Sequence, residues 1–210
     1  MRKTPIVLIA LHVLLAAQVA GAQAPDTQVR LIFHKRPTAS GRSLVGWVIL
    51  PDITAKNQVG RGSGLTVLAM FGMGWANESG WLELLVGSRT NQKGALLFEP
   101  TFNLRVSRRV DEWNLYGEVH LYPRGRPART IFFASTNTRL VGFSAIAMHI
   151  GGEIEIINRF HGLDSWGGGP HVSMVLRVPP GIGLRQVAIT VARQFRNDPG
   201  FTRWYVVLVY

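Results

Sequence analysis

The sequence contains no cysteine, so disulfide bonds and thiolate metal sites are excluded. It is also poor in acidic residues, with 12 Asp and Glu against 23 Lys and Arg. Beyond the N-terminal segment the longest apolar stretches are interrupted by Gly, Pro or charge, and no stretch of useful length has helical periodicity. A fold with these absences depends on strand packing, on a membrane, or on both.

The first residues have the form of an export signal. Arg2 and Lys3 precede an apolar core from Pro5 to Val19, and Ala20-Gly21-Ala22 supplies a small-residue cleavage site. We expect cleavage after residue 22, although Ala22-Gln23-Ala24 is a second candidate and an uncleaved N-terminal anchor is the alternative. The core is shorter than the roughly 20 apolar residues that a spanning helix needs. Residues 1–22 are therefore expected to be removed, leaving residues 23–210 as one domain.

The remaining chain predicts an all-β fold, because short apolar or alternating segments are separated by clusters of Gly, Pro and Asn. This rhythm favours an antiparallel up-and-down β-barrel of about 8–12 strands, with a sandwich as the alternative. The expected strands are Gln28–His34, Leu44–Leu50, Leu65–Trp75, Gly80–Ser88, Ala95–Ser107, Glu112–Tyr122, Arg129–Ser135, Leu140–His149, Glu153–Phe160, Pro170–Val178, Arg185–Phe195 and Phe201–Tyr210.

The segment from Phe98 to Leu121 alternates most clearly. Successive side chains of a strand point to opposite sides of the sheet, so each of its two expected strands has an apolar face and a charged face. A membrane barrel turns the apolar face to lipid, whereas a soluble barrel or sandwich buries it. In a membrane barrel the apolar residues Phe98, Phe102, Leu104, Trp113, Leu115, Val119 and Leu121 would meet lipid. The charged face would then form a charge network in the lumen, made of Glu99, Arg105, Glu112 and Glu118.

The last strand carries a further pattern. Trp204, Val206, Leu208 and Tyr210 are apolar at every second position, and the chain ends on an aromatic residue. This resembles the C-terminal signal of bacterial outer-membrane β-barrels, which their assembly machinery reads. Together with the export signal, the lack of cysteine and the Trp and Tyr residues near strand ends, the chain resembles small outer-membrane barrels as a class.

The resemblance implies a location in the outer membrane, with outer-membrane lipid, lipopolysaccharide and the barrel-assembly machinery as partners. We expect a non-enzymatic barrel of structural or narrow-passage type, with a small solute as a possible cargo. The alternative is a soluble periplasmic or secreted β-barrel or sandwich that binds an apolar or anionic ligand.

A third candidate function is a lipid-modifying hydrolase. His171 and Ser173 lie two residues apart and share one strand face. This pair resembles the His-x-Ser of lipid A deacylase barrels, and the resemblance implies a histidine base and a serine nucleophile. The residues after Ser173, Met174-Val175-Leu176, do not match that family. A carboxylate to orient the base would have to come from Asp164, Glu153 or Glu155.

Other chemistry is not indicated. The histidines are scattered without ligand spacing, so we expect no metal and no cofactor. The basic residues form no platform with interleaved aromatic residues, so nucleic acid is not an expected partner. The glycine-rich segment from Asp164 to Pro170 lacks the Lys-Ser/Thr of a phosphate loop and predicts a flexible surface loop.

Overall fold

The computed structural model describes residues 27–36, 38–50, 66–93, 95–124, 128–161, 164–181, 183–197 and 201–210. The expected signal segment, residues 1–22, lies outside the described residues. The strands are β1 (Thr27–Lys35), β2 (Ser40–Ile49), β3 (Thr66–Asn77), β4 (Gly80–Lys93), β5 (Ala95–Val110), β6 (Trp113–Tyr122), β7 (Arg129–Gly142), β8 (Ile146–Arg159), β9 (Ser165–Arg177), β10 (Gln186–Arg196) and β11 (Phe201–Val209).

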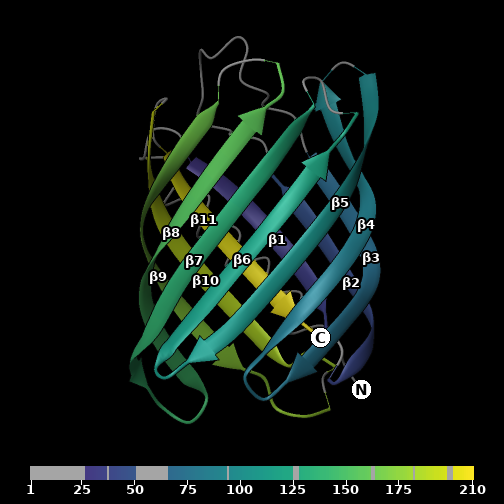
Figure 1. Ribbon diagram of the computed structural model, residues 1–210. Coiled ribbons are helices and arrows are strands. Elements are labelled where there is room, and N and C mark those ends of the chain that lie inside the picture. Colours follow the sequence, from purple (N-terminus) through teal and green to yellow (C-terminus); the bar gives the residue numbers. More distant parts are fainter. Residues whose placement is uncertain are drawn as a thin grey trace.

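These eleven strands form one closed barrel in which each strand pairs with its sequence neighbours (Figure 1). The expected all-β barrel is confirmed, and its strand count lies within the predicted range. The expectation of wholly antiparallel pairing is wrong at one seam, because β1 and β11 pair in parallel, with Leu31 opposite Val206. An odd number of alternating strands makes the first and last run in the same direction, so closure requires a parallel pair.

The strand count differs from the twelve predicted segments because the expected strand Leu140–His149 does not exist. Residues 143–145 form a turn that the Phe143 N–H closes by donating to the Ile146 carbonyl oxygen at 2.7 Å. The predicted strands Arg129–Ser135 and Glu153–Phe160 correspond to parts of the longer strands β7 and β8. The sequence is mostly apolar through residues 143–145, so it was predicted as one strand. Composition alone does not indicate a turn made of small or apolar residues.

The glycine-rich segment is also different from its prediction. Residues 165–170 belong to β9 and are not a surface loop. A Cβ atom on Gly169 would lie 1.8 Å from the carbonyl oxygen of Arg193, so glycine is required for β9 and β10 to approach this closely.

Alternation places the apolar face outside and the charged face inside. On β5 and β6 the side chains of Phe102, Leu104, Trp113 and Leu115 are exposed, whereas Arg105 and Glu118 are buried. The side chain of Phe98 lies outside the described part. The outer face of β3–β9 is an apolar belt that includes Val67, Phe71, Met73, Leu82, Leu84, Val86, Phe102, Leu104, Val106, Leu115, Leu121, Phe132, Met148, Ile150, Ile154, Ile156, Val172 and Met174.

The inside of the barrel is filled unevenly. Side chains from β1–β4 form an apolar cluster that includes Ile32, Val45, Trp47, Leu68 and Met70. Strand β3 is therefore apolar on both faces, which explains why its sequence alternates poorly. Polar and charged side chains fill the other part of the interior.

The aromatic residues do not all lie on the outer face. Trp75 and Trp113 are exposed near the ends of their strands, but Trp47, Tyr122 and Tyr205 are buried inside. The sequence could not separate these two groups, because aromatic residues suit both a lumen core and an outer belt.

The outer face differs at the parallel seam. Val206 and Leu208 on β11 are 1% and 6% exposed, and Leu184 from the β9–β10 connection packs on them. Trp204, Val206, Leu208 and Tyr210 do share the outward side, but only Tyr210, at 40%, is clearly exposed.

The two ends of the barrel are unlike. At one end, lower in Figure 1, lie the connections 36–39, 78–79, 111–112, 143–145 and 178–185 and the end of β11; we call it the hairpin end. Asp111 adopts a φ of 52°, which Asp tolerates better than most residues and which allows the tight β5–β6 turn. At the other end, called the loop end, β2 ends at Ile49 and β3 begins at Thr66. Among the described residues, no helix is long and apolar enough to cross a membrane.

Candidate functional site in the barrel interior

Two groups of buried charges occupy the lumen. The first, the Glu83 network, contains His34, Ser43, Glu83, Arg105, Tyr116 and Glu118. The Glu83 carboxylate accepts from His34 Nε2 at 2.7 Å, from Ser43 Oγ at 2.5 Å and from Arg105 Nη1 at 3.2 Å. Arg105 Nε also donates to Tyr116 Oη at 3.0 Å and lies 3.4 Å from Glu118 Oε2. Tyr116 Oη donates to Glu118. The buried arginine is thus balanced by two carboxylates.

The second group, the Glu155 network, contains Arg30, Glu153, Glu155, Gln194, Arg196, Arg203 and Tyr205. Glu155 accepts from Arg196 Nη1 at 2.7 Å and from Arg203 Nη2 at 2.9 Å, and Arg30 Nη2 lies 3.7 Å from its second oxygen. Arg203 Nη1 donates to Tyr205 Oη at 2.9 Å. Tyr205 Oη in turn donates to Glu153 at 3.1 Å. This network joins β8, β10, β11 and β1 across the parallel seam.

The predicted lumen network of Glu99, Arg105, Glu112 and Glu118 is divided among three places. Arg105 and Glu118 meet in the Glu83 network. Glu99 lies toward the loop end and pairs with Arg129 Nη2 at 2.5 Å, with Arg89 Nη1 at 3.9 Å. Glu112 is in the exposed turn at the hairpin end. The β5–β6 register explains the split, because Arg105 lies opposite Glu118 while Glu112 precedes the first residue of β6.

The two networks and the apolar cluster close the middle of the barrel. Glu83, Thr101, His120, Gln194 and Arg203 are each at most 1% exposed. Charged side chains such as Glu83 and Arg203 are seldom fully buried unless they are paired, and these two are paired with Arg105 and Glu155. The lumen in this region is a packed interior.

On the hairpin side of this packed region lies a cavity of about 540 Å³. Arg105, Glu118, Glu153 and Tyr205 contribute to its floor from the two networks. Its mouth opens at the hairpin end, where the lining residues Arg109, Arg139 and Arg177 are exposed. The cavity is therefore a cup with one open end, of the size usual for small-molecule sites.

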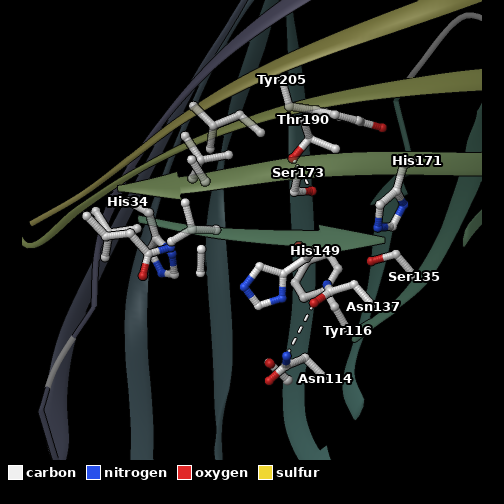
Figure 2. A pocket seen from close by; sticks show the side chains of 18 of the residues that line it. His34, Asn114, Tyr116, Ser135, Asn137, His149, His171, Ser173, Thr190 and Tyr205 are labelled. Atoms are coloured by element: carbon white, nitrogen blue, oxygen red, sulfur yellow. Dashed lines mark hydrogen bonds between the residues drawn. The ribbon is translucent and has the colours of Figure 1, made fainter. Parts of the chain in front are cut away.

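One wall of the cup is built from two rows of directly paired residues on β8, β9, β10, β11 and β1. The row nearer the mouth is apolar and consists of Ala147, Val175, Ala188, Val207 and Ile32. The deeper row is polar and consists of His149, Ser173, Thr190 and Tyr205. Figure 2 shows Ser173 beside Thr190, with His149 near them and Asn114 bonded to Asn137 at 3.2 Å.

The mouth is strongly basic. Arg36, Arg109, Arg139 and Arg177 line it from four separate parts of the chain, and Glu112 is the acidic residue that lines it among the described residues. Arg36 lies over the ring of Trp81 at 5.5 Å. Burial lowers the pKa of Arg36 from its ordinary value, an effect that Glu83 opposes, but an arginine remains charged at neutral pH.

His171 and Ser173 both face the cup, as their shared strand face predicted, and each lies beside a different side chain. Ser173 Oγ is hydrogen-bonded to Thr190 Oγ1 at 2.8 Å. His171 Nδ1 lies 3.8 Å from Glu153 Oε2, beyond hydrogen-bond distance. Asp164 is at the loop end, where it accepts from the Arg159 N–H at 2.8 Å. In the described part of the chain no three His, Asp or Glu side chains are grouped to hold a metal ion.

Several residues of the site were not predicted from the sequence. Arg203 is central to the Glu155 network, and its strand parity could have revealed it, since odd positions of β11 oppose the apolar series ending at Tyr210. Arg36, Arg109 and Arg139 at the mouth carried no such signal, because arginines near turns are ordinary surface residues.

Comparison with known proteins gives no relative: no family model, no curated protein and no solved structure matches the chain.

Proposed function

We propose that this protein is a small outer-membrane β-barrel that is closed to general passage and presents a binding cup at its hairpin end. The observation that carries the proposal is the distribution of side chains across the barrel wall. Its outer face is an apolar belt, and its inner face holds paired charges. Soluble monomers rarely expose apolar patches beyond a few hundred Å², whereas membrane barrels have this inside-out pattern.

The buried middle of the lumen favours a structural or receptor role over the narrow-passage role. A solute crossing the barrel would have to separate the Arg203–Glu155 pair, at 2.9 Å, or pass the side chains of the Glu83 network. Each of these groups is desolvated, so leaving one unpaired is costly. The cup therefore ends at a floor and does not continue as a pore.

The direction of the cup follows from the turns. Bacterial outer-membrane barrels have short turns on the periplasmic side and longer loops outside. The tight connections 78–79 and 111–112 lie at the hairpin end, whereas Ile49 and Thr66, the strand ends that 16 residues of sequence separate, lie at the loop end. The cup would then open to the periplasm.

A soluble periplasmic or secreted barrel is the second candidate function, and the cup itself is the observation in its favour. A ligand-binding barrel with an internal cavity is a common soluble architecture. A lipid-modifying hydrolase has less support, because Ser173 is bonded to Thr190 and no histidine in the described part of the chain is bonded to its Oγ.

Cell fractionation tests the proposal. The mature protein should sediment with outer membranes, resist extraction by salt and carbonate, and migrate differently on gels before and after boiling. Recovery in the soluble fraction without detergent would contradict it. In planar bilayers the purified protein should give no stepwise conductance, and stable conductance steps would contradict the closed lumen.

A further inference from the structure

The cup combines two features that a ligand would have to match. Its mouth carries the guanidinium groups of Arg36, Arg109, Arg139 and Arg177, and Glu112 is the acidic residue at the mouth among the described residues, whereas Glu118 and Glu153 lie at the floor. Directly inside the mouth, the row of Ala147, Val175, Ala188, Val207 and Ile32 forms an apolar surface.

The arginines at the mouth differ from the deeper arginines, which are held in buried ion pairs. Arg105 and Arg203 are buried against carboxylates at 3.2 and 2.9 Å. Arg139 and Arg177 are exposed, and no carboxylate lies within ion-pair distance of either in the described part of the chain. Their positive charge is therefore available to a ligand, and Arg binds carboxylate and phosphate groups with two parallel hydrogen bonds.

The apolar row makes room for a ligand body. Ala147 and Ala188 are the smallest members, and they lie directly opposite Val175 on both sides. The deeper row of His149, Ser173 and Thr190 offers hydrogen bonds to a polar group at the far end of such a body. A bare inorganic anion would leave the apolar row uncovered, and a purely apolar molecule would leave the arginines without a partner.

We propose that the cup binds a small amphipathic organic anion, with its carboxylate or phosphate at the arginine mouth and its apolar body against the Ala147–Ile32 row. This inference rests on the proposed function only for the side from which the ligand arrives, namely the periplasm. The chemistry of the cup itself does not depend on the location of the barrel.

A charge series on one apolar body tests the ligand class. The mature protein in lipid nanodiscs is titrated calorimetrically with 4-phenylbutyrate, its neutral amide and 4-phenylbutylamine, with empty nanodiscs as the blank. The carboxylate should bind about tenfold tighter than the amide, with the amine weakest. Acetate at equal concentration should not displace it, because acetate lacks the body. Equal binding of carboxylate and amide, or displacement by acetate, would overturn the proposal.

Adjacent arginines on β5 provide a matched pair of variants. Arg109 faces the cup, whereas Arg108 lies opposite Leu115 on the outer side. Arg109→Gln should weaken 4-phenylbutyrate binding several-fold, and Arg108→Gln should leave it unchanged, since only the former alters charge at the mouth. Equal effects of the two substitutions would contradict an ion site inside the cup.

Filling the apolar row is the complementary change. Ala147→Phe places a ring in the cup at a partly exposed position, so it should abolish binding while the barrel still shows heat-modifiable migration. Unchanged binding would refute the site. A soluble protein that binds the carboxylate would refute the membrane proposal alone, and a membrane barrel without binding would refute the cup proposal alone.

Discussion

An arginine in the middle of the outer belt separates a membrane barrel from a soluble one. Leu104 is 41% exposed on the outer side of β5, and Val110 is 44% exposed on the same side at the hairpin end. The two positions therefore match in strand, face and exposure, and they differ in height along the barrel wall.

The expected magnitude follows from that height. Six residues of strand at roughly 3.3 Å each, tilted about 45°, separate the two positions by roughly 14 Å along the membrane normal. This is close to half of a hydrocarbon layer of about 30 Å. If Val110 lies at the interface, Leu104 lies near the midplane. An arginine costs about 2–4 kcal/mol at the midplane and about 0–1 kcal/mol near the interface.

Reversible urea unfolding in lipid vesicles, followed by tryptophan fluorescence, measures both variants. Leu104→Arg should lower the free energy of unfolding by about 2–4 kcal/mol, and Val110→Arg by about 1 kcal/mol or less. In a soluble barrel both residues face water, so both substitutions should fall within about 0.5 kcal/mol of wild type. A Leu104→Arg protein as stable as wild type would refute the lipid-facing belt.

Three further predictions concern the lumen, the C-terminus and the cup. Glu155→Gln should lower the free energy of unfolding by about 3–5 kcal/mol, because it removes the carboxylate that Arg196 and Arg203 share. Glu99→Gln, at a more exposed ion pair, should lower it clearly less. Equal losses of stability on urea unfolding would contradict the argument from burial. Removal of Tyr210 should reduce the amount of heat-modifiable protein in outer membranes if the last strand is an assembly signal, and unchanged assembly would exclude that role. The Tyr210 N–H also donates to the His34 carbonyl oxygen at 2.9 Å. Tyr210→Phe keeps this hydrogen bond and an aromatic ring, so it serves as the control. Ser173→Ala should leave lipid A acylation of the host unchanged when it is measured by mass spectrometry. A loss of deacylated lipid A relative to wild type would instead support the hydrolase function.

Much of the architecture could be predicted from local pattern. The alternation on Phe102–Arg105 and Trp113–Glu118 has a period of two, which fixes two faces for each strand whatever the strand pairs with. This was sufficient for an all-β barrel and for Arg105 and Glu118 on one face. It failed across residues 143–145, where apolar residues continue through a turn. Strand β3 was predicted correctly as Leu65–Trp75 although both of its faces are apolar.

The sequence by itself therefore determined the strand class and which side chains share a face. Only the tertiary structure decided the parallel β1–β11 seam, the separation of Glu112 from Arg105, and the pairing of Arg203 with Glu155, 48 residues away. It also decided that Ser173 meets Thr190 and that arginines from β5, β7 and β9 surround one mouth. The physical reason is that alternation is a property of one strand, whereas contacts across the lumen depend on how many strands close the barrel and in what register.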